Sequence, residues 1–171
     1  MPGPSASTAE KNKPKVSVVC VTFNSADCLR YLLKSLEKLP PDEIEIIFVD
    51  NHSSDSSVEL IRKWGRASLI IQNEQNGGWS AANNQGLKAA KGEFILLANP
   101  DIWFEPQALR DLVRFLGERS EFAAAAPQLL NPDGSIQPSF RRLPTLTDLV
   151  FQITGLAFLF PQSFSLFSHF V

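Results

Sequence analysis

The chain has 171 residues, of which 44% are hydrophobic and 20% are charged. This composition is ordinary for a globular domain with a hydrophobic core and excludes disorder of the whole chain. The formal net charge of −2, with no Lys/Arg cluster beyond Arg141 and Arg142, gives no electrostatic footprint for nucleic acid. Two cysteines, Cys20 and Cys28, form neither a disulfide framework nor a metal-ligand pattern, which favours reduced thiols in a cytoplasmic setting.

The two ends of the chain differ from its middle. Residues 1–14 are small and polar, contain several prolines and lack the apolar core of a secretory signal, so we expect a disordered tail. Residues 149–171 are rich in phenylalanine and contain no Asp, Glu, Lys or Arg, but Pro161 and several polar residues interrupt any membrane-spanning helix. We expect this segment either to pack on the domain or to expose an apolar patch for peripheral membrane contact or self-association.

Strand and helix patterns alternate between these ends. In chain order, the sequence predicts a strand at 16–22, a leucine-striped helix ending near Leu39, a strand at 44–49, a helix at 54–64, a strand at 69–71, a helix at 80–90, a strand at 94–98, a helix beginning at Pro106 and a strand at 122–126. Asn24 or Ser25 is suited to cap the first helix. The alternation predicts a doubly wound α/β fold with a mostly parallel sheet covered on both faces.

Polar clusters follow four of the predicted strands, and in this fold class ligands bind at the carboxyl ends of the strands. The clusters are "VTFNS", "VDNHSSD", "NEQNGGWSAANN" and "NPD". The tripeptide Asn-Pro-Asp also occurs a second time, at 131–133, where Gly134 follows it between apolar residues. That second copy predicts a reverse turn or hairpin, whereas the first copy, at 99–101, ends an apolar run.

Several common site chemistries lack their motifs. The sequence has no G-x-G-x-x-G, no phosphate-binding P-loop, no zinc-ligand spacing and no G-x-S-x-G elbow. What remains is a set of carboxylates and amides. Asp50 is suited to accept a hydrogen bond from a base N–H or a ribose hydroxyl, and Phe23 to lie against a base. Asp101 is a lone oxygen ligand of the kind that holds Mg²⁺ or Mn²⁺ together with substrate phosphates.

Four stretches in this order resemble the family-2 glycosyltransferases of GT-A fold, in particular their bacterial rhamnosyltransferase-like branch: VSVVCVTFNSADCLRYLLKSL, IIFVDNHSSDSSVELI, NGGWSAANNQGLKAAKGEFILLANPD and SFRRLPTL. The resemblance covers residues 16–148 and implies a nucleotide-sugar-binding domain over 15–148. In this branch Asn-Pro-Asp often stands where other members have an Asp-x-Asp metal motif. Two residues depart from the common pattern, namely Trp79 in place of phenylalanine and Asn99 at the first acidic position.

The resemblance implies these donor-binding residues: Thr22, Phe23, Asn24, Asp50, Asn76, Asn84 and Asn99. The first three would surround the nucleotide base, and Asp50 would contact the edge of that base. Asn76 and Asn84 would face the ribose or diphosphate of a UDP- or dTDP-sugar. Asp101 would bind Mg²⁺ or Mn²⁺, through which the diphosphate is held.

The activity implied is inverting transfer of a sugar, rhamnose in this branch, to a hydroxyl of a glycan or lipid-linked acceptor in cell-surface polysaccharide synthesis. The family's general base lies in a later acidic segment, but no carboxylate side chain follows Asp148 here. We therefore expect the donor half of the fold without its acceptor half. The expected location is the cytoplasm, with a peripheral position at the inner membrane face.

Two alternatives to this enzyme stay open. A non-catalytic or truncated nucleotide-sugar-binding module would account for the missing base. A sugar-phosphate nucleotidyltransferase of related fold is the weaker alternative, because no glycine-rich basic loop follows Val21.

Overall fold

The computed structural model describes residues 13–139, 146, 150, 153 and 154. The chain divides into two compact units, one ending at Ala123 and one beginning at Ala124, and each is described here by itself. The predicted tail at 1–14 and the phenylalanine-rich segment at 149–171 lie almost wholly outside the described residues, so both stay predictions. Within the described part of the chain, no helix has the length and apolar character needed to cross a membrane.

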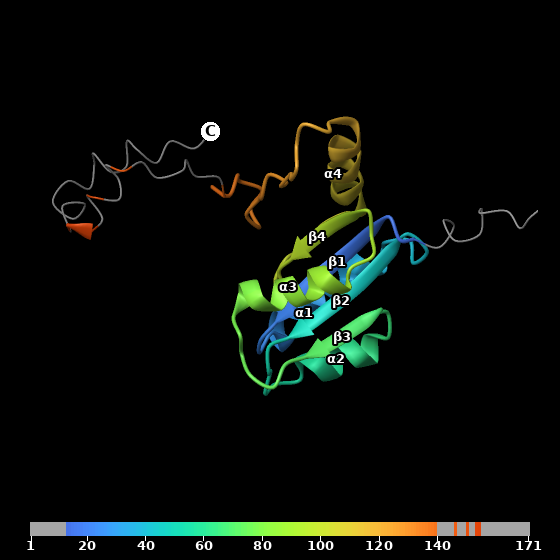
Figure 1. Ribbon diagram of the computed structural model, residues 1–171, viewed down its shortest axis with the longest axis vertical. Coiled ribbons are helices and arrows are strands. Elements are labelled where there is room, and N and C mark those ends of the chain that lie inside the picture. Colours follow the sequence, from blue (N-terminus) through green and yellow to red (C-terminus); the bar gives the residue numbers. More distant parts are fainter. Residues whose placement is uncertain (1–12, 140–145, 147–149, 151–152, 155–171) are drawn as a thin grey trace, which may run out of the picture. The chain divides into compact units, whose positions relative to one another are not determined.

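The first unit alternates strands and helices in the predicted order (Figure 1). Its elements are β1 (Val16–Thr22), α1 (Ala26–Glu37), β2 (Ile44–Asp50), α2 (Ser57–Trp64), β3 (Leu69–Gln72), α3 (Trp79–Ala89), β4 (Phe94–Ala98) and α4 (Pro106–Glu118). The strands lie in the order β3-β2-β1-β4, and every neighbouring pair is parallel. The predicted α/β fold class is confirmed.

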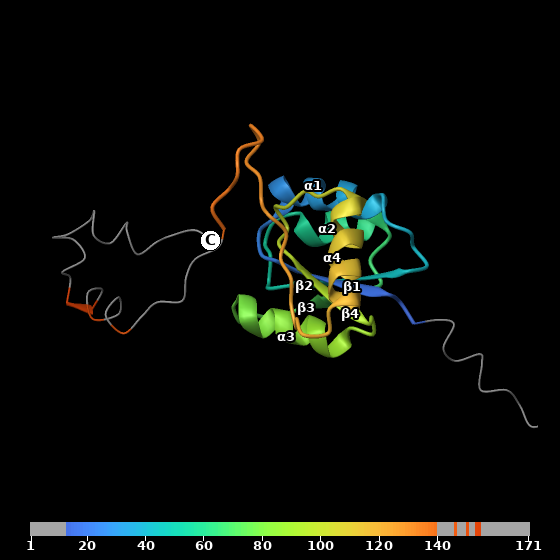
Figure 2. The same ribbon diagram turned by 90° about the horizontal axis from the view of Figure 1, so that it is seen from above.

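Helices cover both faces of the sheet, with α1 and α2 on one side and α3 on the other (Figure 2). Alternate residues of β1 serve the two faces, because side chains alternate along a strand. Val18 and Cys20 pack with leucines of α1 and with Leu109 of α4, while Val19 and Val21 pack in a second cluster with Ala82 of α3. The strands β1 and β2 are therefore buried on both sides.

Helix α3 approaches β1 closely at a glycine. A Cβ atom at Gly86 would lie 2.3 Å from Cγ1 of Val19, far inside van der Waals contact. Only glycine lets the helix backbone come this near to the strand without displacing either element. This contact sets the position of α3, whose first turn begins at the carboxyl edge of the sheet.

One predicted strand and one predicted helix boundary differ from the structure. The strand predicted at 122–126 is wrong, since these residues form no strand. The Phe122 ring instead packs on Phe115 of α4 with centroids 5.3 Å apart, and the alanines that follow are poor strand formers. The helix predicted at 54–64 begins only at Ser57, because the preceding residues bond to the loop after β1.

The second unit contains the predicted turn at the later Asn-Pro-Asp. Leu130 and Ile136 form an antiparallel bridge. Between them, Asn131 N donates to Ser135 O over 2.8 Å, and Gly134 N donates to Asn131 O over 2.9 Å. Gly134 has φ +83°, a left-handed conformation that favours glycine. The predicted hairpin turn is confirmed.

Candidate functional site

The carboxyl ends of the strands meet at one edge of the sheet. Thr22 at the end of β1 is in register with Asp50 at the end of β2, and Asp50 with Gln72 at the end of β3. On the other side of β1, Ala98 is in register with Cys20, so the residues after β4 also leave the sheet at this edge. The parallel sheet thus gathers the predicted residues from three strand ends.

Thr22 and Asp50 form a buried floor at this edge. The Thr22 hydroxyl donates to Asp50 Oδ1 over 3.0 Å, the Ser53 hydroxyl to the same oxygen over 2.5 Å, and Ser53 N to Asp50 Oδ2 over 2.9 Å. Thr22 is 0% exposed and Asp50 1% exposed, whereas Phe23 is 48% exposed. In this structure Asp50 organises the loop after β2, and the Phe23 ring is open to solvent beside it.

Asn24 ties the loop after β1 to the loop after β2. Its backbone has φ +48°, a conformation that asparagine adopts more readily than most residues. Its N–H donates to Ser53 Oγ over 2.9 Å, and its Oδ1 accepts from Ser54 N over 2.8 Å. The side-chain oxygen of Asn24 is therefore already engaged. Its NH₂ group has no hydrogen-bond partner within the described residues and is left to bind a ligand.

Asp55, which the sequence reasoning missed, caps α1 from across the site. Ala26 N donates to Asp55 Oδ2 over 2.9 Å, and Ser57 N and Oγ donate to Asp55 Oδ1 over 2.9 and 2.5 Å. Burial raises the pKa of the Asp55 carboxyl, but the bonds from Ser57 and Ala26 outweigh it and hold that pKa below its ordinary value. The signal was the run Ser53–Ser57, where serines flank one aspartate and favour local hydrogen bonds.

Amide side chains hold the loop between β3 and α3. Asn51 Nδ2 donates to Gly78 O over 3.1 Å, and Asn73 Nδ2 donates to Asn51 Oδ1 over 2.8 Å. Asn76 Oδ1 accepts from Gly78 N over 2.9 Å. Asn76 and Asn84 are both exposed, and the Asn84 side chain, which lies in α3, has no hydrogen-bond partner among the described residues. The Asn76 NH₂ group in this loop and the Asn84 amide in α3 are therefore free to bind a ligand.

Asp101 lies in a turn after β4, in which Ile102 N donates to Asn99 O over 3.5 Å. Its carboxylate is exposed and has no hydrogen bond or ion pair within the described residues. Burial raises the pKa of the Cys28 thiol, and the negative charge of Asp101 raises it further. Because β4 runs parallel to β1, the turn that holds Asp101 lies at the same edge of the sheet as Phe23 and Asn24.

The side chains available at this edge as metal ligands limit the kind of metal that fits. The described residues contain no group of three or more His, Cys, Asp or Glu side chains that could hold a metal ion. Asp101 offers one free carboxylate, which suits Mg²⁺ or Mn²⁺ held mainly by substrate phosphates and water. It does not suit a metal that needs a complete cage of protein ligands, such as structural zinc.

Comparison with known proteins relates the chain to sugar transferases. Residues 17–169 match the model of the family described as Glycosyl transferase family 2. The chain is 31% identical over 143 residues to the poly(ribitol-phosphate) beta-glucosyltransferase of Bacillus spizizenii, an alignment that covers 80% of this chain and 23% of that protein.

Two solved structures share the fold. The Staphylococcus aureus protein TarS in complex with UDP-GlcNAc superposes with a TM-score of 0.57 and 34% identity, covering 62% of this chain and 32% of that one. The mannosyltransferase PcManGT of Pyrobaculum calidifontis, in complex with GDP-Man and Mn²⁺, superposes with a TM-score of 0.56 and 26% identity, covering 61% and 32%.

The chain spans between 23% and 32% of the length of these three proteins. The match to the family model, over residues 17–169, includes Thr22, Asp50 and Asp101. Because the family model matches most of the chain, the protein described here belongs to glycosyl transferase family 2.

Proposed function

We propose that this chain carries the donor-binding half of a glycosyltransferase that uses a UDP- or dTDP-sugar. The observation that carries the proposal is the exposed Asp101 carboxylate at the same sheet edge as Phe23 and the Asp50 floor. Support also comes from the solved relatives, which hold UDP-GlcNAc in one case and GDP-Man with Mn²⁺ in the other. The acceptor proposed is a hydroxyl of a glycan or lipid-linked saccharide.

The base is proposed to lie against Phe23. The half-exposed ring stands next to Thr22 and offers an apolar face for stacking, which contributes about 1–3 kcal/mol per base in nucleic-acid complexes. Asp50 Oδ2 accepts one hydrogen bond in the structure, and a carboxylate oxygen can accept two. A base N–H would take the remaining acceptor position, with Asn24 NH₂ as a neighbouring donor.

The ribose and diphosphate are proposed to lie over the loop before α3 and the turn after β4. Asn76 and Asn84 provide amide groups on one side, and Asn99 and Asp101 lie on the other. When bound, Mg²⁺ or Mn²⁺ would neutralise the charge that builds on the departing diphosphate. Asp101 is the residue that would hold the ion, and the asparagine amides would orient the uncharged part of the donor.

The reaction proposed is an inverting displacement. An acceptor hydroxyl attacks the anomeric carbon while the bond from that carbon to the diphosphate oxygen breaks, and a base takes the hydroxyl proton. The names of the relatives include glucose, N-acetylglucosamine and mannose as transferred sugars. Rhamnose is proposed from the sequence resemblance alone, and it is the first sugar to test.

Calorimetric titration of the 171-residue chain tests the donor site. UDP and dTDP are titrated with Mn²⁺, with Mg²⁺ and with EDTA, and GDP serves as the nucleotide control. The proposal expects UDP or dTDP to bind, and to bind more tightly with either metal. Folded protein that binds neither nucleotide under any of the three conditions contradicts it.

A second candidate function is nucleotide-sugar binding without turnover. It is favoured because the residues gathered at the sheet edge, among those that the structure describes, are all assigned to the donor and none to the acceptor hydroxyl. Measuring nucleotide release from a UDP- or dTDP-sugar with candidate acceptors separates the two functions. Robust turnover by this chain removes the binding-only function, and tight donor binding with no turnover supports it.

The location is proposed to be the cytoplasm, with contact to the inner membrane face through residues 149–171. This proposal rests on the apolar, uncharged composition of that segment. Liposome co-sedimentation of the full chain, compared with a chain that lacks residues 149–171, tests it. Equal partitioning of the two chains excludes a membrane role for the segment.

A further inference from the structure

The segment that follows Asp101 has an alternating pattern of exposure. Ile102 and Phe104 are partly buried and pack against the main hydrophobic cluster, while Asp101, Trp103 and Glu105 are exposed. Successive side chains of an extended segment point to opposite sides, so a shift of one residue would exchange the two sets. The outward direction of the Asp101 carboxylate therefore depends on what fixes the register of this segment.

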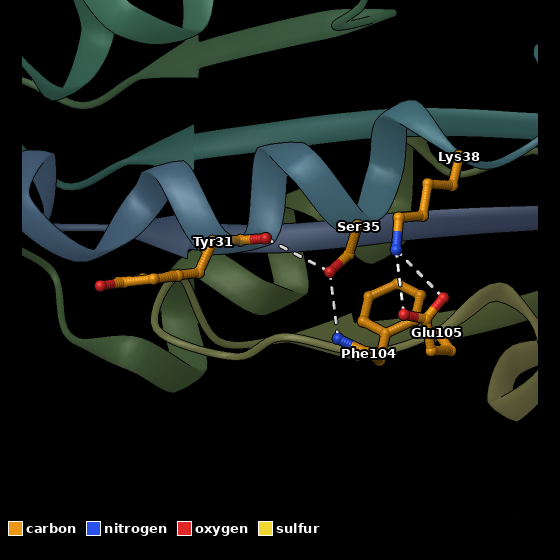
Figure 3. Close-up of polar contacts among 5 residues, drawn as sticks. All are labelled: Tyr31, Ser35, Lys38, Phe104 and Glu105. Atoms are coloured by element: carbon orange, nitrogen blue, oxygen red, sulfur yellow. Dashed lines mark hydrogen bonds and ion pairs between the residues drawn. The ribbon is translucent and has the colours of Figure 1, made fainter. Parts of the chain in front are cut away.

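Ser35 in α1 fixes that register through the backbone (Figure 3). Its hydroxyl oxygen accepts a hydrogen bond from Phe104 N over 3.0 Å, and the hydroxyl donates to Tyr31 O over 3.2 Å. Ser35 is 0% exposed, so its loss would leave the Phe104 N–H without its partner in a partly buried place. An unsatisfied buried donor is costly, which makes this bond specific for one register.

A second contact comes from Lys38, the residue that follows the last turn of α1. Lys38 Nζ lies 2.9 and 3.1 Å from the two carboxylate oxygens of Glu105, and 5.6 Å from the ring centroid of Trp103. Both side chains of the ion pair are about half exposed, and exposed pairs contribute little to stability. Ser35 is therefore the main anchor, and Lys38 supports it.

We propose that Ser35 is a positioning residue for the Asp101 carboxylate. It acts through the backbone of Phe104, three residues after Asp101, and holds Ile102 and Phe104 on the core side so that Asp101 faces the site. The inference rests on the proposed function, in which Asp101 holds the metal of a metal–nucleotide complex.

The test compares the binding of UDP and dTDP with Mn²⁺ and with EDTA in three variants. Ser35→Ala is expected to weaken Mn²⁺-dependent binding about tenfold, the lower range for residues that orient a metal ligand, and to leave binding in EDTA unchanged. Ser35→Thr retains the hydroxyl and is expected to restore most of the loss. Because alanine is a good helix former, Ser35→Ala is expected to fold.

Ser17→Ala is the matched control. Ser17 is also 0% exposed, and its hydroxyl oxygen accepts from Lys91 N over 3.2 Å and from Gly92 N over 2.8 Å, ahead of β4 at the opposite edge of the sheet. The Ser17→Ala substitution removes a buried hydroxyl that bonds the chain before β4, whereas the Asp101 segment follows β4 and is not contacted. Ser17→Ala is therefore expected to lower stability and to leave Mn²⁺-dependent binding as in the wild type.

The possible failures are distinguishable. If the wild-type chain binds neither nucleotide, the proposed function fails, and the positioning role fails with it. If the wild type shows Mn²⁺-dependent binding and Ser35→Ala matches it, or if Ser17→Ala loses as much, the positioning role alone is overturned. Hydrogen exchange gives a readout without any ligand: the Phe104 amide is expected to be protected in the wild type, and fast exchange there overturns the anchor.

Discussion

The two Asn-Pro-Asp tripeptides have aspartates in opposite surroundings. Asp133 Oδ1 accepts from Ser135 N over 2.9 Å and from Ser135 Oγ over 2.6 Å, and these bonds hold the pKa of the Asp133 carboxyl below its ordinary value. Asp101 has no hydrogen bond or ion pair among the residues that the structure describes. The same three letters thus form a self-contained turn in one place and present a free carboxylate in the other.

The residues that come next account for the difference. After Asp133, Gly134 adopts a left-handed conformation and brings Ser135 back onto the carboxylate. After Asp101, Ile102 and Phe104 pack toward the core and carry the chain away along α1. A short polar motif binds its own neighbours when the chain can fold back locally, and it is left open to a ligand when tertiary packing draws the following residues elsewhere.

The largest expected effect comes from removing the free carboxylate. Asp101→Ala should abolish the tightening of UDP or dTDP binding by Mn²⁺ or Mg²⁺, because the ion loses its only proposed protein ligand. Calorimetry with metal and with EDTA measures this. Asp133→Ala is the control and should bind as the wild type does; equal losses in the two variants would contradict the distinction between the tripeptides.

The next largest effect is a loss of stability in the sheet that positions Asp101. Gly86→Ala should lower the free energy of unfolding by about 1–3 kcal/mol, because the added Cβ collides with Val19 and overpacks the interface of α3 and β1. Urea titration, monitored by circular dichroism, measures the loss. Gly134→Ala, at a position where a Cβ meets nothing within 4 Å, strains only the turn and should change the unfolding midpoint much less. A midpoint of Gly86→Ala equal to that of the wild type would refute the close contact.

A smaller effect is expected from pH. The pKa of Asp55 is lower in the folded chain than in the unfolded one, so its stabilising contribution is complete above the unfolded value near 4 and is lost as the pH falls through the lower folded value. Asp55→Asn should therefore flatten the dependence of the unfolding midpoint on pH below about 4. An unchanged slope would show that Asp55 does not couple α1 to α2 in the folding transition.

The smallest effect is expected for Asp133 itself. Its pKa is also lowered, but its bonds lie within one exposed turn that opens locally. Asp133→Asn should shift the global unfolding midpoint by no more than the error of the titration, as is typical of surface substitutions. Denaturant titration at pH 7 measures it, and a larger loss would show that the turn belongs to the cooperative core.

Much of the fold was predictable from local patterns. Apolar strands and leucine-striped helices alternate, so the order of the elements and the parallel sheet follow from periodicity and chain connection rules. The fold class then placed the polar ends of β1, β2 and β4 at one edge. The strand predicted at 122–126 failed because Phe122 packs on Phe115, and a ring contact of that kind overrides a short apolar run.

The sequence by itself determined which residues reach the carboxyl edge, because the parallel direction of the strands follows from the βα pattern. Only the tertiary structure decided which of their atoms are left to bind a ligand. Asp50 Oδ1 and Asn24 Oδ1 are engaged by Ser53 and Ser54, which leaves Asp50 Oδ2 with one acceptor position and Asn24 with its NH₂ group. Asp101 is kept open by a bond between Ser35 and Phe104, residues 69 positions apart. Such long-range partners depend on how helices dock on the sheet, and no local pattern encodes that docking.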